Sequence, residues 1–350
     1  MNRLNYIGCK HTLSPNILKI IRSNVPNLNQ CHFGDLFAGT GSISFYLEPH
    51  VAHVSANDNE YYAYVINRGL LCCSYSENLR DIIVECNLLE RVPGLVYENF
   101  SPHASCERMF FTNENAMKCD AIRQYIETLY DTESIDEREY YFLLASLLVS
   151  MDKVANTASV YGAYLKEFKA SALKELKMEP IHRSVLFHQD ANCVYQRDIN
   201  SLVRDTEYDV VYLDPPYNQR QYGANYSPLN YIAHYSSNIE IKGKTGLISD
   251  YSKSDYCKKD EVVSCFDDLL RNLRAKYVFI SYNNEGLMEE SKMRELFGKY
   301  GSLKLYKMPY HRYKSHRGIE LTEVFEYLWV IRRDESAGGY EEIYFSDDVI

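Results

Sequence analysis

Long apolar stretches are missing from this 350-residue sequence. No apolar run reaches the roughly 20 residues that a membrane-spanning helix needs, and residues 1–6 contain no hydrophobic segment typical of a signal peptide. The chain also lacks a C-x-x-C pair, and its ten cysteines are scattered apart from Cys72-Cys73. These absences predict a cytoplasmic protein with reduced thiols and without a membrane span.

A surplus of positive charge is missing as well. The chain has 38 lysines and arginines against 48 aspartates and glutamates, which gives a net charge of −10. This balance argues against a protein that coats nucleic acid over its whole surface, although it allows a local basic face. The ten histidines show no metal-ligand spacing with cysteine, and His311 and His316 fit a basic surface loop better than a metal site. We therefore expect no bound metal.

The most informative stretch runs from residue 209 to residue 217 and reads D-V-V-Y-L-D-P-P-Y. Its apolar part predicts a short buried strand, which the two prolines end because they have no N–H to donate. Asp214 then stands at the carboxyl end of a strand, where open α/β sheets bind ligands. Asp214 and the Pro215 carbonyl can accept hydrogen bonds from a planar amine such as that of adenine. The Tyr217 ring can stack on a base, although a turn in which Tyr217 merely packs remains open from these residues alone.

A second motif lies near the N-terminus, where residues 33–42 read F-G-D-L-F-A-G-T-G-S. A strand leads into a turn in which Gly39 and Gly41 permit a sharp bend and the close approach of a ligand. The G-x-G pattern is not the full dinucleotide fingerprint. A further strand, 51–58, ends in Asp58, at the offset from Asp35 where nucleoside-binding α/β folds place an acid for the ribose hydroxyls. Asp58 could also cap the next helix, and the two roles are compatible.

Helical patterns follow one another at 78–91, 114–130 and 136–155. Because so long a departure between two strands is not a loop, we predict an inserted, mainly helical domain at 72–185. The catalytic domain would then comprise 1–71 and 186–350. Basic and aromatic residues alternate in 164–183, which suits phosphate contacts or, equally, a solvated helix face.

The remaining pattern is α/β in character. We expect strands at 193–200, ending near Asp198, at 277–282 and at 323–331. Residues 218–226 are long enough to close over a site, and 241–259 is Lys- and Ser-rich, which favours a mobile surface loop. The tail after Arg333 is acidic and is expected to add little to the fold. We expect one basic face built from 164–183, 242–259 and the basic run 311–317.

Taken together, the motifs resemble a known family. N-Y-I-G-C-K at 5–10, D-L-F-A-G-T-G at 35–41 and D-P-P-Y at 214–217, in this order, are similar to the Dam-like class of N6-adenine DNA methyltransferases. This is the α-arranged type that is often paired with restriction enzymes, and the resemblance covers about residues 1–335. Cys9 departs from the pattern, since the family more often has serine there.

The resemblance implies a seven-stranded Rossmann-like sheet that binds S-adenosylmethionine without a metal, and an enzyme that methylates a flipped-out adenine in double-stranded DNA. Position by position, Tyr6 and Lys10 would meet the methionine end of the cofactor, Asp58 the ribose, and Asp198 the adenine amino group of the cofactor. The turn residues would line the cofactor: Asp35, Phe37, Ala38, Gly39 and Gly41. Asp214, Pro215 and Tyr217 would hold the target adenine, with Pro216 keeping the turn rigid.

The resemblance also sets expectations for partners. The insertion would read the DNA sequence, and we expect DNA contacts from Lys166, Lys169, Arg183, Arg220, Tyr222, Arg312, Lys314 and Arg317. A monomer would suffice to flip one base. A cognate restriction endonuclease would belong to the same bacterial or phage-encoded system without a direct contact being implied.

Other assignments share parts of the pattern. Cytosine 4-amino methyltransferases use a similar geometry, but they usually carry serine where this chain has Asp214. A guanine-amine methyltransferase of RNA is disfavoured by the helical insertion. A catalytically idle subunit would not need the glycine turn, Asp58 and Asp214 together, and a nicotinamide-dependent oxidoreductase would need the missing third glycine.

Overall fold

The computed structural model describes residues 1–310, 324–334 and 339–345. Its centre is an eight-stranded sheet in the order β10-β8-β9-β7-β4-β1-β2-β3. The strands are β1 (His32–Asp35), β2 (His53–Asn57), β3 (Cys193–Tyr195), β4 (Glu207–Leu213), β7 (Arg274–Asn283), β8 (Ser302–Tyr310), β9 (Val324–Arg332) and β10 (Tyr340–Tyr344). β1 pairs in parallel with β2 and β4, and β4 with β7, whereas β9 runs antiparallel to β7 and β8. This arrangement is the predicted Rossmann-like α/β sheet.

The acidic tail contributes the eighth strand, β10, which pairs in parallel with β8. The ammonium of Lys307 on β8 lies 2.8 Å from a carboxylate oxygen of Glu342, and the Arg294 guanidinium lies 3.8 Å from the Tyr340 ring centroid. Two expectations are therefore wrong: that the sheet has seven strands, and that the tail adds little to the fold. Its glutamates look like a solvated tail in the sequence because their basic partners lie far away along the chain.

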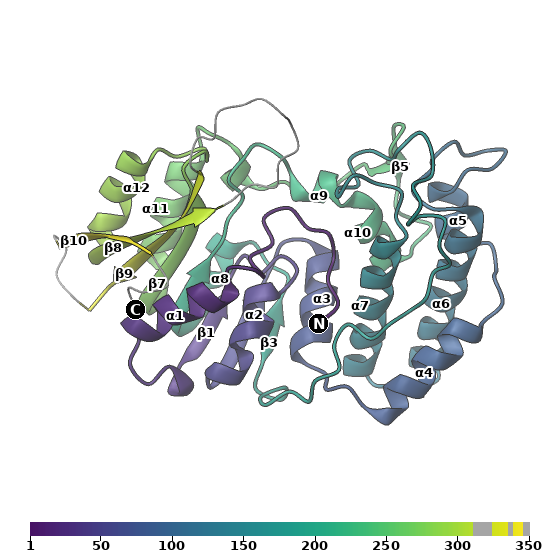
Figure 1. Ribbon diagram of the computed structural model, residues 1–350, viewed down its shortest axis with the longest axis horizontal. Coiled ribbons are helices and arrows are strands. Elements are labelled where there is room, and N and C mark those ends of the chain that lie inside the picture. The colour runs from purple at the N-terminus through teal and green to yellow at the C-terminus, as the bar shows by residue number, and fades with distance from the viewer. Residues whose placement is uncertain (311–323, 335–338, 346–350) are drawn as a thin grey trace.

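Helices cover both faces of the sheet (Figure 1). Along β4, Val210 and Tyr212 point into one apolar core, and Val211 and Leu213 point into the other. This alternation follows from the two-residue period of a strand.

The helices are α1 (Ser14–Asn24), α2 (Ser42–Leu47), α3 (Tyr61–Leu71), α4 (Glu77–Leu88), α5 (Leu95–Phe100), α6 (Asn113–Asp131), α7 (Glu137–Lys153), α8 (Ile199–Asp205), α9 (Tyr222–Asn225), α10 (Ser227–His234), α11 (Val262–Asn272) and α12 (Glu290–Phe297).

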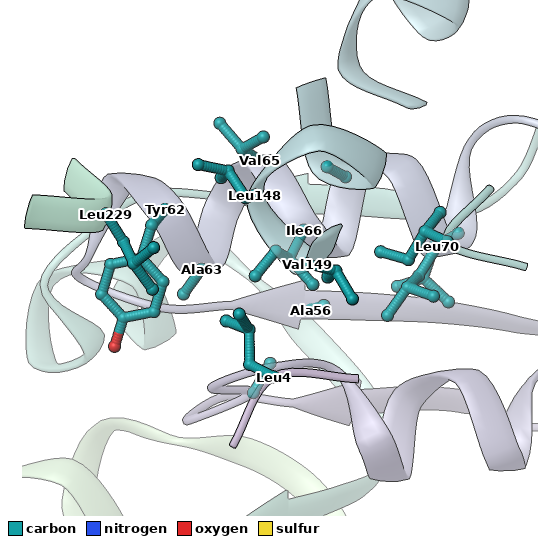
Figure 2. Close-up of a cluster of buried hydrophobic side chains, with 14 of the residues drawn as sticks. Leu4, Ala56, Tyr62, Ala63, Val65, Ile66, Leu70, Leu148, Val149 and Leu229 are labelled. Atoms are coloured by element: carbon teal, nitrogen blue, oxygen red, sulfur yellow. The ribbon is translucent and has the colours of Figure 1, made fainter. Parts of the chain in front are cut away.

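The helical region between β2 and β3 shares its core with the sheet. α7 begins at a capping box formed by Asp136 and Glu139, and it is buried along most of its length. Figure 2 shows Leu148 and Val149 of α7 beside Ile66 of α3, so one apolar core runs from β2 into the helical layer. The predicted division into a 72–185 domain and a catalytic domain stays a proposal.

The close approach of α3 and α7 depends on a glycine. A Cβ at Gly69 would lie 2.7 Å from the Cβ of Ala145 and 3.1 Å from the Tyr141 carbonyl oxygen. Because real Cβ atoms do not approach so closely, Gly69 permits a helix contact that any larger residue would force apart.

Residues 241–259 form more regular structure than the surface loop that the sequence favours. β5 (Ile241–Lys242) and β6 (Leu247–Ile248) make an antiparallel hairpin. Arg108 donates hydrogen bonds to the carbonyls of Gly243 and Lys244, at 3.0 and 3.2 Å, and so anchors the turn. The end of the segment is also packed, since Tyr256 and Cys257 are buried.

In the part of the chain that the structure describes, no helix is long and apolar enough to cross a membrane. The ten cysteines are all free thiols.

Candidate active site

A cavity of about 790 Å³ opens at the carboxyl ends of β1, β2 and β4. Sequence-predicted residues from five separate parts of the chain meet in its wall: Tyr6, Lys10, Asp35, Phe37, Ala38, Gly39, Asp58, Asp198, Asp214, Pro215, Pro216, Tyr217 and Tyr222. Gly41 is not part of the lining, but its neighbours Thr40 and Ser42 are. One cavity thus contains both the glycine turn and the D-P-P-Y strand end.

The glycine turn is held from two sides. Gly39 and Gly41 have φ angles of +51° and +71°, in the left-handed region that glycine favours. The Gly39 N–H donates to Asp58 Oδ2 at 2.8 Å, and the Asn67 amide donates to the Gly39 carbonyl at 3.0 Å. A Cβ at Gly41 would lie 2.6 Å from Asn67 Oδ1. These contacts therefore hold the turn in one backbone conformation, with Gly39 in the cavity wall.

Asp35 is buried behind this turn. Its Oδ2 accepts hydrogen bonds from the Ser44 N–H and hydroxyl at 3.1 and 2.6 Å, whereas Oδ1 is buried without a hydrogen-bond partner among the described residues. Burial raises the pKa of Asp35 to about 7, and the hydrogen bonds from Ser44 oppose this shift. An unpaired carboxylate oxygen at a cavity wall is suited to a cationic ligand.

Tyr6 closes the cavity over the turn. Its ring packs against Tyr226 and Tyr222, with centroids 4.8 and 5.4 Å away, and its Cε1 lies 3.0 Å from the Cβ position of Gly39. The Tyr62 hydroxyl donates to the Tyr6 oxygen at 3.2 Å. The N-terminal loop is thus fixed against the segment that contains α9 and α10.

Asp58 and Asp198 lie at neighbouring strand ends. Asp58 Oδ1 accepts from the Glu60 N–H at 2.9 Å, and burial raises its pKa. Asp58 is not the cap of α3, since Glu60 holds that position. Asp198 caps α8 through Oδ1, which accepts from the Ser201 N–H at 3.0 Å. Both carboxylates border the cavity, and their contacts with a cofactor stay predictions.

At the other end of the cavity, Asp214 forms an ion pair. The Lys10 ammonium lies 2.9 Å from both oxygens of Asp214 and donates to the Gly8 carbonyl at 3.1 Å. The Tyr217 hydroxyl is hydrogen-bonded to Asp214 and, at 2.8 Å, to Glu326 on β9. The predicted contact of Lys10 with the methionine end of the cofactor stays untested, but its ammonium lies at the D-P-P-Y strand end.

The charges of this cluster follow from its contacts. Burial lowers the pKa of Lys10, but Asp214 and Glu326 outweigh that effect and hold it above its ordinary value. Burial raises the pKa of Asp214, Lys10 lowers it, and Glu326 raises it further. Two carboxylates therefore share one ammonium in a largely buried cluster.

Two buried glutamates were missed in the sequence. Glu326 has one sign in the sequence, since it is the single charged residue between Val324 and Ile331 in a strand that is otherwise apolar and aromatic. No feature of the sequence indicates that Glu60 is buried, because it follows the polar stretch Asn-Asp-Asn, which is typical of an exposed turn. Its carboxylate accepts from Asn230 at 2.7 Å and from Ser252, and so links α10 and the 241–259 segment to the start of α3.

The predicted DNA contacts are less concentrated than the cavity residues. Lys166, Arg183 and Arg220 are exposed, whereas the Lys169 ammonium donates to the Thr157 carbonyl at 2.6 Å. Tyr222 lines the cavity, and its hydroxyl donates to the Ile7 carbonyl at 3.3 Å. Arg312, Lys314 and Arg317 lie outside the described residues, as does the 311–317 part of the predicted basic face.

Within the described ranges, no group of three or more histidine, cysteine, aspartate or glutamate side chains is arranged to hold a metal ion. The cavity instead combines, at one end, a carboxylate with one oxygen that has no partner among the described residues and, at the other, hydrogen-bond acceptors and an aromatic ring.

Comparisons with known proteins show the family of this chain. Residues 6–296 match the family model described as D12 class N6 adenine-specific DNA methyltransferase. The chain is 45% identical over 344 residues to the type II methyltransferase M.NlaIII of Neisseria lactamica, covering 94% of this chain and 99% of that protein. It is 39% identical to M.CviAII of Paramecium bursaria Chlorella virus 1 (95% and 99% covered) and 34% identical to M.FokI of Planomicrobium okeanokoites (95% and 53% covered). The chain belongs to the D12 class of N6-adenine-specific DNA methyltransferases, which use S-adenosylmethionine.

Proposed function

We propose that the two ends of the cavity divide the reaction between them. The glycine-turn end would hold S-adenosylmethionine, and Asp214, Pro215 and Tyr217 would hold the target adenine. The observation that carries this proposal is the shared cavity, because a methyl group can pass directly between two ligands only if they meet in one enclosed space.

The residues at the glycine-turn end suit the cofactor. The unpaired Oδ1 of Asp35 would accept from the ammonium of its methionine part, and the backbone of Gly39 would allow close approach. Asp58 would accept from the ribose hydroxyls, and Asp198 from the adenine amino group. When bound, S-adenosylmethionine supplies a methyl group on a positively charged sulfur, which keeps the electrons of the broken S–C bond and becomes a neutral thioether.

The residues at the other end would prepare the adenine. Asp214 and the Pro215 carbonyl accept hydrogen bonds from the 6-amino group and draw its lone pair out of conjugation with the ring. That lone pair forms the new N–C bond, so N6 becomes positively charged. It then loses one proton, which Asp214 can pass to water. Tyr217 stacks on the base and offsets part of the few kcal/mol that leaving the duplex costs.

The DNA would lie across the mouth of the cavity. We propose that the helical region at 72–185 reads the sequence and that Lys166, Lys169, Arg183, Arg220, Tyr222, Arg312, Lys314 and Arg317 contact the duplex. The enzyme would act as a monomer in the cytoplasm of a bacterium or of a virus-infected cell. It would protect DNA from a restriction endonuclease of the same specificity, as the type II names of its relatives suggest.

The test is to identify the modified nucleoside. Purified protein is incubated with unmodified DNA and methyl-labelled S-adenosylmethionine, and the DNA is then digested to nucleosides. We expect label in N6-methyldeoxyadenosine, and sequencing of the modified sites would give the target sequence. An Asp214→Asn protein run in parallel should label the DNA roughly 10³-fold more slowly. Label in a methylcytosine, or full labelling by Asp214→Asn, would overturn the proposed roles.

A further inference from the structure

Glu326 is a buried carboxylate beside the adenine end of the cavity, where it contacts both Lys10 and Tyr217. It lies on β9 with 7% of its surface exposed. Its Oε1 is 2.8 Å from the Tyr217 hydroxyl and 2.9 Å from the Ser281 hydroxyl of β7. It also lies 3.4 Å from the Lys10 ammonium. A buried carboxylate needs polar partners such as these hydroxyl groups. Its position between Lys10 and Tyr217 is nevertheless more specific than packing alone requires.

Lys10 stands between two acids. Its ammonium has three N–H groups, and within reach lie the Gly8 carbonyl at 3.1 Å, Asp214 at 2.9 Å and Glu326 at 3.4 Å. The contact with Asp214 is the shorter one. A small movement of a flexible lysine side chain would make Glu326 its main partner without breaking the contact with Gly8.

The observed arrangement conflicts with the reaction. Both oxygens of Asp214 face the Lys10 ammonium, and one of them also accepts from Tyr217. An adenine amino group must compete for the same oxygens. The ammonium would also repel the positive charge that develops on N6 during transfer, and this repulsion is strong at a buried site. Lys10 must therefore move away from Asp214 before the chemistry.

We propose that Glu326 is a positioning residue that accepts the Lys10 ammonium when adenine takes its place at Asp214. This inference rests on the proposed role of Asp214. With Lys10 charged and Asp214 and Glu326 both ionised, the cluster carries one net negative charge, which suits the positive charge that develops on N6 during transfer. Without the Glu326 charge, Lys10 would have Asp214 as its one carboxylate within reach among the described residues, and it would stay there.

The central variant is Glu326→Gln, which keeps the size of the side chain and an oxygen that can accept from Ser281. We expect the single-turnover rate of methyl transfer at saturating cofactor and DNA to fall on the order of 10- to 100-fold. Cofactor affinity and the fluorescence of 2-aminopurine placed at the target base should stay unchanged, since cofactor binding and base flipping do not need the charge. An unchanged transfer rate would overturn the inference.

A second variant separates positioning from a structural role. If Lys10 blocks Asp214 when Glu326 is neutralised, then Lys10→Met in the Glu326→Gln background should raise the rate, by about threefold or more over Glu326→Gln alone. If Glu326 only supports Tyr217, the two losses should accumulate and the double variant should be slower still. That second result would refute the transfer of Lys10 between the acids.

Two further proteins complete the design. Glu342→Gln is the matched control, because Glu342 also pairs with a lysine, Lys307 at 2.8 Å, but lies on β10 outside the cavity lining. It should keep the wild-type rate. Asp214→Asn tells the two proposals apart: if it retains full activity, the role of Asp214 fails. If it is inactive and Glu326→Gln is not slowed, only the present inference fails.

Discussion

The two ends of the cavity are built in different ways. The cofactor end is built mainly from two short strand–turn segments, 35–44 and 57–60, in which backbone N–H groups donate to nearby carboxylates, as in the Gly39–Asp58 and Ser44–Asp35 contacts. The adenine end is made of side chains from distant parts of the chain. Lys10 reaches Asp214 across 204 positions, and Tyr217 reaches Glu326 across 109.

This difference has a physical consequence. A backbone turn with positive φ angles is rigid and tolerates little change, whereas a cluster of side chains can rearrange within one backbone fold. The cofactor end should therefore fail as a unit when its turn is altered. The adenine end should lose activity by degrees, according to which contact is removed, while the cofactor still binds.

The sharpest separation of the two ends comes from Asp214→Asn. The amide no longer offers two acceptor oxygens, and it cannot stabilise the positive charge on N6. We expect methyl transfer to fall by roughly 10³-fold, near the upper range for one electrostatic contact, while the affinity for S-adenosylmethionine by equilibrium dialysis changes little. Asp260→Asn, at an exposed position, is the control. Loss of cofactor binding in Asp214→Asn would mean that the ends are not independent.

Gly41→Ala tests the opposite case, in which the cofactor end is damaged. Its φ of +71° disfavours alanine, and the added Cβ would lie 2.6 Å from Asn67 Oδ1, which belongs to the residue that holds Gly39. We expect a stability loss of about 1–3 kcal/mol and a cofactor affinity that falls at least about tenfold, which is 1.4 kcal/mol.

Gly298→Ala is the matched control for that variant, because a Cβ there meets nothing within 4 Å and its φ is −62°. It should leave both denaturation and cofactor binding unchanged. Normal cofactor affinity in a stably folded Gly41→Ala protein would show that the turn does not shape the cofactor end.

Two variants of Tyr217 can distinguish stacking on the base from hydrogen bonding at the adenine end. Tyr217→Ala removes the ring, so we expect target-base fluorescence and transfer to fall by an amount that corresponds to roughly 1–3 kcal/mol. Tyr217→Phe keeps the ring but removes the hydroxyl bonded to Asp214 and Glu326, and should cost only a few-fold in rate, about 1 kcal/mol. Equal losses in the two variants would contradict a stacking role.

What the sequence could predict follows the same division. The glycine turn, Asp58 and the D-P-P-Y strand end were found because each lies within one strand–turn segment, where spacing determines geometry. The family resemblance is confirmed, as are the sheet type and the cofactor. The Lys10–Asp214 pair depends on where the N-terminal loop lies, and the place of Glu326 in the cluster depends on how β4, β7 and β9 align, so neither could be predicted from the sequence. β10 was missed for the same reason: its partners on β8 are more than 30 positions away.

The smallest effect on activity is expected at Glu60, which ties the segments around Asn230 and Ser252 to α3. Burial raises the pKa of Glu60 from 4.5 to about 7, against the hydrogen bonds from Ser252 and Asn230. The folded protein therefore holds a proton that the unfolded chain has lost between these pH values, so this group makes stability fall as pH rises from 4.5 through 7.

Glu60→Gln removes this dependence, because an amide resembles the protonated acid and can donate to Ser252. We expect equal stability below pH 4.5 and a variant that is more stable above pH 7, by at most about 3 kcal/mol. Thermal unfolding between pH 4.5 and pH 7 measures the difference in stability between wild type and Glu60→Gln. Asp35 is present in both proteins, so its contribution cancels in that difference. Glu342→Gln should behave oppositely, since Lys307 lowers the pKa of Glu342 and its contribution is lost as pH falls. If wild type and Glu60→Gln changed in parallel with pH, the Glu60 carboxyl would not be protonated in the fold, and an ionised carboxylate would accept the hydrogen bonds from Asn230 and Ser252.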